Sequence, residues 1–243
     1  MLRVVPKIVI FVQLSIILPC YNPLPGWHEH IITSIEKIRK EIAGVELILV
    51  NDGSPVDLSR DIAVLKKEIP GLKYIHYHEN KGKGNAIRTG LSKAEGRYII
   101  YTDIDFPYTH ESFMRIYETL ISDKCDIAVG VKDDLYYEHV PLLRKWTSKT
   151  LRFMTSRLLR ISITDTQCGL KGLNQHAARI LEQGQINRYL FDLEMIYNAE
   201  RMHQRLLPVP VSLREGVSFS KVKMKILVRE FTNFMTIISQ KRS

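Results

Sequence analysis

Two aspartates separated by one residue, Asp103 and Asp105, directly follow the apolar run RYIIYT at residues 97–102. Such a run is typical of a buried strand, so both carboxylates are expected just beyond the edge of a sheet. Carboxylates this close repel each other unless a cation or a basic group neutralises them. Mg²⁺ or Mn²⁺ suits this position, because either ion accepts one or two protein carboxylates and completes its shell with diphosphate oxygens and water. Asp103 and Asp105 are therefore candidate metal ligands.

Polar turns also follow two earlier apolar runs, at residues 19–23 and 51–55. Each turn by itself is explained equally well by the preference of Asp, Asn and Gly for turns and helix caps. Three such turns together favour a site, because the carboxyl ends of parallel strands meet at one edge of a sheet and leave a ligand crevice there.

Strand-like and helix-like segments alternate over the first half of the chain, which predicts an α/β fold with a mostly parallel central sheet flanked by helices. Strands are predicted at 14–18, 45–50, 74–77, 97–102 and 126–131, with an edge strand at 208–211. Helices are predicted at 29–42, 58–65, 86–91, 142–159 and 219–240, and two more between 172 and 200. We divide the chain into an N-terminal extension (1–13), one domain (14–215, with halves 14–105 and 106–215) and a basic amphipathic C-terminal helix (216–243).

The composition is that of a chain able to bury one substantial core, with 45% hydrophobic residues among 243. Lys and Arg number 35 against 26 Asp and Glu, and the resulting charge of +9 favours an anionic partner such as nucleic acid, a phospholipid surface or a phosphorylated ligand. The three cysteines lie outside any CxxC spacing, so neither a disulfide framework nor a zinc site is indicated, and a reducing compartment such as the cytoplasm fits best.

The first twenty residues are apolar enough to suggest a leader, but Arg3, Pro6, Lys7 and Gln13 interrupt every stretch long enough to span a bilayer. Their second half is therefore predicted to be a buried strand. The alternative, that residues 1–12 are a membrane-associating or non-native leader, stays open.

Four motifs in order, LPCYN (18–22), NDGS (51–54), NKGKGNA (80–86) and DID (103–105), resemble those of family-2 glycosyltransferases with the GT-A fold. The later motifs DTQCGLK (165–171) and FDLE (191–194) are similar to the dolichyl-phosphate glucosyltransferase and mannosyltransferase branch, so the resemblance covers roughly residues 14–200. It implies an inverting, metal-assisted enzyme that transfers a hexose from a UDP- or GDP-sugar to a polyprenyl or dolichyl phosphate.

The resemblance also implies roles for particular residues. Pro19, Tyr21 and Asp52 would form the base and ribose pocket, and Lys83 would offer charge to a phosphate or a sugar hydroxyl, unless it and Lys81 are solvated loop lysines. The expected donor-binding set is Pro19, Tyr21, Asn22, Asp52, Gly53, Lys83, Gly84, Asp103 and Gln167, with Asp103 and Asp105 on the metal.

Asp165 is expected to reach the donor sugar or the acceptor, the alternative being a turn or helix cap. Asp192 and Glu194 either face the site or favour a helix N-terminus through its dipole. The chain departs from the family at Pro107, where the mannosyltransferase branch often carries Gln, and at Pro23, where an acid is usual. Transmembrane helices that often follow in this branch have no counterpart here.

The acceptor is indicated by basic residues between Asp103 and Asp165. A phosphate acceptor is already anionic and needs cations, whereas a hydroxyl acceptor needs a positioned base. Six basic residues interleaved with Trp146 and Phe153 suit a phosphate on an apolar chain, and Arg144 and Arg157 are the first candidates. The alternative is an amphipathic helix with a solvated basic face. The expected catalytic set is Asp105, Asp165, Arg144 and Arg157.

The C-terminal segment carries Lys221, Lys223, Lys225 and Arg229 beside an apolar stripe. This pattern favours a helix lying in a membrane interface, which would place the enzyme peripherally at the inner, cytoplasmic face. A homodimer seam or a helix packed on the core explains the stripe equally well.

Other functions are weighed against these motifs. A family-2 transferase acting on a saccharide or glycolipid hydroxyl, as in cell-surface polysaccharide synthesis, would need a base such as Asp165 or Asp192. Nucleic-acid binding is disfavoured, because no helix-turn-helix, RNP-type strand or zinc spacing is present. A sugar-nucleotide pyrophosphorylase would carry an N-terminal Gly-rich phosphate loop, which is missing. A catalytically inactive binding module is disfavoured by the retention of both Asp103 and Asp105.

Overall fold

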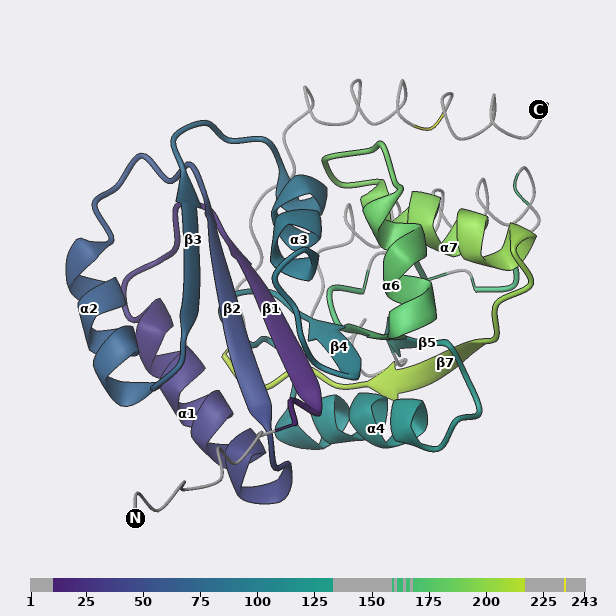
Figure 1. Ribbon diagram of the computed structural model, residues 1–243, viewed down its shortest axis with the longest axis horizontal. Helices are drawn as coiled ribbons and strands as arrows, with labels where there is room; N and C mark the ends of the chain where they lie inside the picture. Colours follow the sequence, from purple (N-terminus) through teal and green to yellow (C-terminus); the bar gives the residue numbers. More distant parts are fainter. Residues whose placement is uncertain are drawn as a thin grey trace, which may run out of the picture.

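The computed structural model describes residues 11–132, 159, 161–163, 165–166, 168–216 and 234. These form a seven-stranded sheet in the order β3-β2-β1-β4-β6-β5-β7, with helices on both faces (Figure 1). The strands are β1 (Leu14–Cys20), β2 (Val45–Asp52), β3 (Lys73–Tyr77), β4 (Tyr98–Tyr101), β5 (Ile127–Lys132), β6 (Lys171–Asn174) and β7 (Leu206–Val211). The helices are α1 (Trp27–Glu41), α2 (Ser59–Glu68), α3 (Lys83–Leu91), α4 (His110–Ile121), α6 (Gln175–Glu182) and α7 (Phe191–Arg201).

The sheet is mostly parallel, as the sequence predicts. β6 runs antiparallel to its neighbours β4 and β5, and the other paired strands run parallel. The register places Ile17 of β1 beside Ile48 of β2 and Tyr101 of β4. The carboxyl ends of β1, β2 and β4 therefore lie side by side, and the antiparallel β6 begins at the same edge, because Lys171 pairs with Tyr101.

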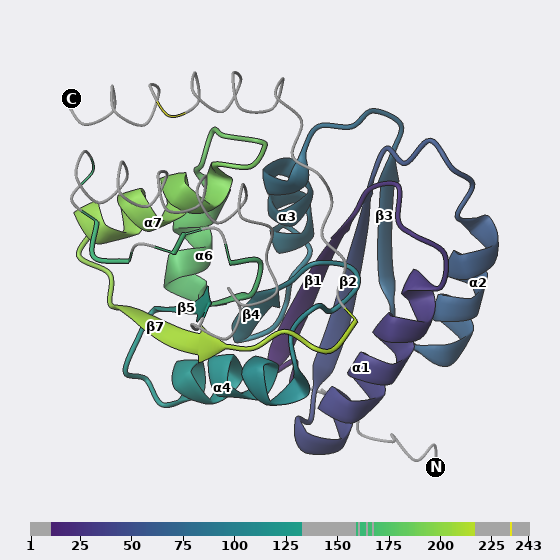
Figure 2. The ribbon, with the colours of Figure 1, turned by 180° about the vertical axis from the view of Figure 1, so that it is seen from behind.

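Two layers of helices cover the sheet (Figures 1 and 2). Helices α1, α2 and α4 pack on one face against Ile16, Leu18 and Leu49, and α3, α6 and α7 pack on the other face against Ile17 and Ile48. Successive strand residues point to opposite faces, so a strand buried on both sides is apolar at nearly every position. This is why continuous runs such as LSIIL predict the central strands.

Two elements are absent from the sequence-based prediction. Helix α4 begins after Thr109, whose side chain accepts a hydrogen bond from the Ser112 amide at 3.2 Å, and buries Phe113, Ile116 and Leu120 at helical spacing. Both signals are present in the sequence. Strand β6 has no such signal, since its residues KGLN contain a glycine and no alternation. Its Gly172 packs against Ile116 and Leu120 of α4, where a larger residue has no room.

The helices predicted at 142–159 and 219–240 lie outside the described residues, apart from Leu159 and Phe234, which are buried. Residues 1–10 of the predicted N-terminal extension also lie outside them. Within the described part of the chain, no helix combines the length and apolarity that crossing a bilayer requires. The predicted edge strand is confirmed, because β7 closes one side of the sheet with Pro208 and Pro210.

Candidate active site

A cavity of about 620 Å³ opens at the edge of the sheet where β1, β2 and β4 end. It is lined by the turn after β1, by Asp52, by the loop before α3 and by Asp103–Asp105. Residues much later in the chain complete it, namely Arg188, Tyr189, Arg214 and Gly216. The three polar turns predicted to share one edge therefore do so, and both halves of the domain contribute to the cavity.

Asp103 and Asp105 both line this cavity. Burial and the neighbouring charge of Asp103 raise the pKa of Asp105, and Arg214 and His30 offset only part of that rise. The turn that carries the pair is held from the far end of the chain, because the Arg214 guanidinium donates to the Asp105 carbonyl at 3.2 Å and to the Phe106 carbonyl at 3.1 Å. The geometry thus brings like charges together at a cavity wall, where a cation would stabilise both.

Lys83 already places a positive charge at this point. Its ammonium lies 2.6 Å from a carboxylate oxygen of Asp103. Burial acts to lower the pKa of Lys83, but the carboxylates of Asp103 and Asp192 outweigh it and raise the pKa. Lys83 is therefore no solvated loop lysine. Lys81 is exposed, with its ammonium 5.4 Å from the centre of the Tyr77 ring.

Asp52 organises the loop that presents Lys83. One oxygen of its buried carboxylate accepts from the Lys81 amide at 2.8 Å, and the other accepts from the Gly82 amide at 2.9 Å and the Asn80 side chain at 3.0 Å. Gly53, at a φ of 68°, packs directly against the backbone of residues 78–80, so a side chain there would collide with it. Asp52 also lines the cavity, and its predicted contact with base or ribose stays a prediction.

The first turn of α3 lies against the segment before α7. Gly82 has a φ of 105° and packs on the Asn187 carbonyl, and Gly84 packs on Phe191, so both positions need the absence of a side chain. The amides of Gly84 and Asn85 both donate to the Asn187 carbonyl. Because these amides are engaged, the positive charge offered to the cavity comes from the Lys83 side chain.

The turn after β1 contributes Pro19, Tyr21 and Asn22 to the cavity wall. Tyr21 is 53% exposed, and Asn22 has a φ of 48° with its amide donating to Ser54 in the turn after β2 at 3.0 Å. Burial raises the pKa of the Cys20 thiol to about 12, so this thiol is no nucleophile at neutral pH.

Three predicted site residues, Arg144, Arg157 and Gln167, lie outside the described residues. Asp165 is buried, and it does not line the cavity formed by the described residues. Its reach to the donor sugar or acceptor stays a prediction. The neighbouring Gly169 does touch the site, since its α-carbon lies so close to the Asp103 carboxylate that a β-carbon would collide with it.

Asp192 and Glu194 both lie in the first turn of α7, which is the second of the two places considered for them. Both are buried, and neither lines the cavity formed by the described residues. Asp192 pairs with the Lys171 ammonium at 2.9 Å and accepts from the Tyr101 hydroxyl at 2.6 Å. Glu194 accepts from the amides of Gln185 and Ile186, in the loop before α7. These carboxylates join the start of α7 to β4, to β6 and to the loop that precedes the helix.

Several residues that line the cavity lie outside the sequence motifs, among them His30, Arg188, Tyr189 and Arg214. His30 lies on α1, one turn into an amphipathic helix, and gives no local signal. Arg188 and Tyr189 follow the polar turn after α6, and Arg214 follows the edge strand. Only the tertiary arrangement shows that these positions converge.

Asp103 and Asp105 fit a divalent metal whose remaining ligands come from a bound diphosphate and water. Among the described residues, no three His, Cys, Asp or Glu side chains cluster as a complete protein cage. Two carboxylates in a polar cavity match what Mg²⁺ or Mn²⁺ uses when diphosphate oxygens and water supply its remaining ligands. The Lys83 ammonium beside Asp103 shows that this wall accepts positive charge.

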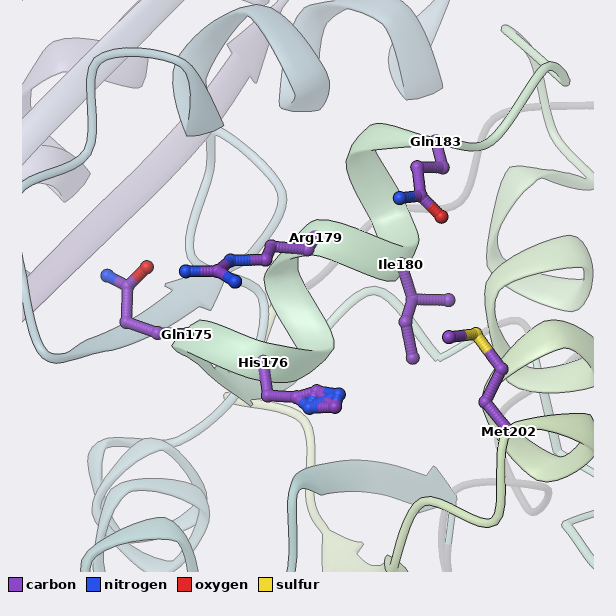
Figure 3. Close-up of a pocket in the computed structure, with 6 residues that line it drawn as sticks. All are labelled: Gln175, His176, Arg179, Ile180, Gln183 and Met202. Atoms are coloured by element: carbon purple, nitrogen blue, oxygen red, sulfur yellow. The ribbon is translucent and has the colours of Figure 1, made fainter.

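A second hollow, of about 490 Å³, lies on the exposed side of α6 (Figure 3). It is lined by Gln175, His176, Arg179, Ile180, Gln183 and Met202, with no carboxylate among them. It shares no residue with the cavity at the strand ends. Of these two cavities, the one at the strand ends has carboxylates in its lining and the one on α6 has none.

Comparison with known proteins gives one family. The profile of glycosyl transferase family 2 matches residues 15–181. A dolichyl-phosphate β-glucosyltransferase of Dictyostelium discoideum is 26% identical over 219 residues, which cover 84% of this chain and 67% of that protein. The corresponding enzyme of Saccharomyces cerevisiae is 26% identical over 235 residues, covering 88% and 70%.

Solved structures give the same fold. Glucosyl-3-phosphoglycerate synthase of Mycobacterium tuberculosis, solved with Mn²⁺, uridine diphosphate and phosphoglyceric acid, aligns with a TM-score of 0.61 at 15% identity, over 89% of this chain and 73% of that one. The same synthase has been solved with Mg²⁺ and uridine diphosphate and aligns with a TM-score of 0.62. The GT-A fold expected from the motifs is thereby confirmed.

Proposed function

The chain belongs to glycosyl transferase family 2, and from this premise we propose that it transfers glucose from UDP-glucose to a polyprenyl or dolichyl phosphate, with inversion at the anomeric carbon. Glucose and the lipid phosphate are proposed because the dolichyl-phosphate β-glucosyltransferases are similar along most of this chain. UDP is the donor nucleotide to test first, because solved proteins with this fold hold it beside Mn²⁺ or Mg²⁺.

The observation that carries the proposal is the convergence of Asp103, Asp105 and Lys83 on one cavity wall. Asp103 and Asp105 would hold Mg²⁺ or Mn²⁺. When bound, such an ion neutralises charge on the departing diphosphate. Lys83 is held beside Asp103 by the loop that Asp52 organises, so its ammonium is in place to contact a phosphate oxygen.

The acceptor half of the reaction needs positive charge more than it needs a base. A phosphate oxygen is anionic at neutral pH and can attack the anomeric carbon without losing a proton. Arg188 and Arg214 bring guanidinium groups to the cavity from the second half of the domain. They would hold the acceptor phosphate against the repulsion of the donor diphosphate. Arg144 and Arg157 remain proposed for the same role.

The experiment uses radiolabelled UDP-glucose, polyprenyl phosphate in detergent and Mn²⁺, followed by extraction into organic solvent. We expect lipid-linked glucose that disappears when EDTA removes the metal, and β-configured product. GDP-mannose in place of UDP-glucose tests the donor. Transfer to a saccharide hydroxyl instead of the lipid would move the enzyme to polysaccharide or glycolipid synthesis and would overturn the proposed acceptor.

The place of the enzyme in the cell is also a proposal. A lipid-phosphate acceptor resides in a membrane, so an enzyme that uses it works at the membrane surface. Flotation of the protein with vesicles containing anionic lipid tests this, and binding should weaken as salt is added, because basic residues supply the attraction. Failure to float at low salt would contradict peripheral attachment. Light scattering on the same samples tests the proposed homodimer.

A further inference from the structure

A lysine with no exposed surface lies beside the end of β4, the strand that leads to Asp103. Lys171, the first residue of β6, is 0% exposed. Its ammonium pairs with the Asp192 carboxylate at 2.9 Å and donates to the Cys168 carbonyl at 2.5 Å. Both charges are thus buried, which is costly unless they are paired and hydrogen-bonded as they are here.

The same carboxylate ties down the strand that carries the metal-ligand candidates. Asp192 accepts a hydrogen bond of 2.6 Å from the hydroxyl of Tyr101, and Tyr101 is the last residue of β4, two positions before Asp103. One carboxylate on α7 therefore fixes the end of β4 and, through Lys171, the turn that contains Cys168. Both links are direct contacts, from Asp192 to Tyr101 and from Asp192 through Lys171 to the Cys168 carbonyl.

This turn in its own right touches Asp103. Gly169 lies so close to the Asp103 carboxylate that a β-carbon at this position would collide with it. The Gly169 amide donates to the Tyr108 hydroxyl at 2.8 Å, which joins the turn to the segment after Asp105. A displacement of the Cys168–Gly169 turn would therefore directly move the Asp103 carboxylate.

We propose that Lys171 and Asp192 are positioning residues, which hold the Cys168–Gly169 backbone against Asp103 and so keep the Asp103 carboxylate turned toward the cavity. A buried ion pair adds little to stability compared with apolar residues of similar volume, so orientation is the contribution for which this pair is suited. The inference rests on the proposed function in one respect, since it takes Asp103 as a metal ligand.

The test is the double variant Lys171→Met with Asp192→Asn, in which neither charge is left unpaired and the Tyr101 hydrogen bond can persist. Free Mn²⁺ is measured by electron paramagnetic resonance in the presence of UDP, together with kcat and the KM for the acceptor. We expect Mn²⁺ affinity and kcat each to fall by roughly 10–100-fold, as is typical when groups behind a metal ligand are removed. The KM for the acceptor should stay unchanged.

Gly169→Ala provides an independent route to the same displacement and should give the same signature with both charges intact. If the double variant does not fold, Asp192→Asn alone takes its place, because the amide keeps the size of the side chain and can still accept from the Tyr101 hydroxyl. The matched control is Lys73→Met with Glu46→Gln, which removes another lysine–carboxylate pair, at the opposite edge of the sheet. Its Mn²⁺ affinity should stay within about twofold of the wild type, because distant sites act independently.

If the folded variant lacking the Lys171–Asp192 pair kept the Mn²⁺ affinity and kcat of the wild type, the inference would be overturned and the proposed function would stand. Wild-type values in Gly169→Ala would overturn it too, because the turn would then have no hold on Asp103. An equal loss in the control pair would also overturn it, because the effect would then be a general loosening of the fold. If the wild-type protein itself showed no Mn²⁺-dependent UDP binding, the proposed function would fail as well.

Discussion

Carboxylates lie at both ends of the strands, at the amino edge and at the carboxyl edge of the sheet, but their pKa values are shifted in opposite directions. At the amino edge, Glu46 accepts from the Ser15 hydroxyl and the amides of Glu95 and Gly96, and it pairs with Lys73 at 2.7 Å. Burial acts to raise the pKa of Glu46, but these partners outweigh it and lower the pKa. At the carboxyl edge, burial and the charge of Asp103 raise the pKa of Asp105.

The difference separates a structural carboxylate from one suited to bind a ligand. Glu46 is nearly enclosed, and its partners come from the starts of β1 and β3 and from the residues just before β4, so it fastens the amino ends of the strands together. Asp103 and Asp105 lie at a cavity wall with their charges adding up. Acidic residues at strand ends are common, and Asp103 and Asp105 stand out because they line a cavity and because the charge of Asp103 helps to raise the pKa of Asp105.

The largest effect is expected when the charge of Asp103, at the carboxyl edge, is removed. Asp103→Asn should lower kcat by roughly 10²–10³-fold, the scale on which one preorganised electrostatic contact contributes to catalysis. The melting temperature should change little, because the substitution removes repulsion with Asp105 as well as the pairing with Lys83. The assay is glucosyl transfer with saturating Mn²⁺. A variant that keeps the wild-type rate would show that the acidic pair has no part in the chemistry.

A second substitution sharpens the comparison within the carboxyl edge. Asp52→Ala removes the acceptor of the Lys81 and Gly82 amides and should raise the KM for the donor about tenfold, because the loop presenting Lys83 loses its anchor. The free energy of unfolding should fall by about 1–3 kcal/mol, the cost of leaving such groups unpaired. Donor titration and urea unfolding measure the two effects. An unchanged KM would mean that the loop keeps its place without Asp52.

The amino edge should respond in the opposite way. Glu46→Gln should lower the free energy of unfolding by about 1–3 kcal/mol, because an amide cannot accept at both positions and leaves Lys73 without its buried partner. This corresponds to a melting temperature lower by roughly 2–4 °C for each kcal/mol. The kcat and the KM of the folded protein should match the wild type. Loss of activity in proportion to that of Asp103→Asn would remove the distinction between the two edges.

The smallest expected effect is a pH dependence at the amino edge. Asp126, just before β5, pairs with Arg205 at 3.0 Å, and its hydrogen bonds to Arg205 lower its pKa to about 2. Since the folded pKa lies below the unfolded value of about 3.9, the pair stabilises the protein fully above that value and the stabilisation is lost as the pH falls toward 2.

Asp126→Asn should therefore flatten the fall in stability between pH 4 and pH 2 by no more than about 1 kcal/mol, because Arg205 is largely exposed. Urea unfolding at several pH values in this range measures the slope, with the wild type as reference. A slope identical in the two proteins would show that the ion pair does not contribute.

Much of the fold follows from local pattern. The runs at residues 14–18 and 45–50 are apolar except for Ser15 and Glu46, which pair with each other, because strands covered on both faces bury nearly every side chain, and the polar turns after them mark the carboxyl ends. Asp103 and Asp105 can be identified because they directly follow such a strand, and Lys83 because it lies in the Gly-rich motif at residues 80–86. Helix α4 was also within reach, given the Thr109 cap and the spacing of Phe113, Ile116 and Leu120.

The sequence by itself determined the class of fold, the edge of the sheet where the polar turns meet and the acidic pair, because each depends on residues close together in the chain. Tertiary structure alone decided that Arg188 and Arg214 reach the cavity, that β6 enters the sheet antiparallel, and that Lys171 and Asp192 meet beside the end of β4. These contacts join residues far apart in the chain. Their partners are chosen by packing and by the need to pair buried charge, and no local spacing encodes that choice.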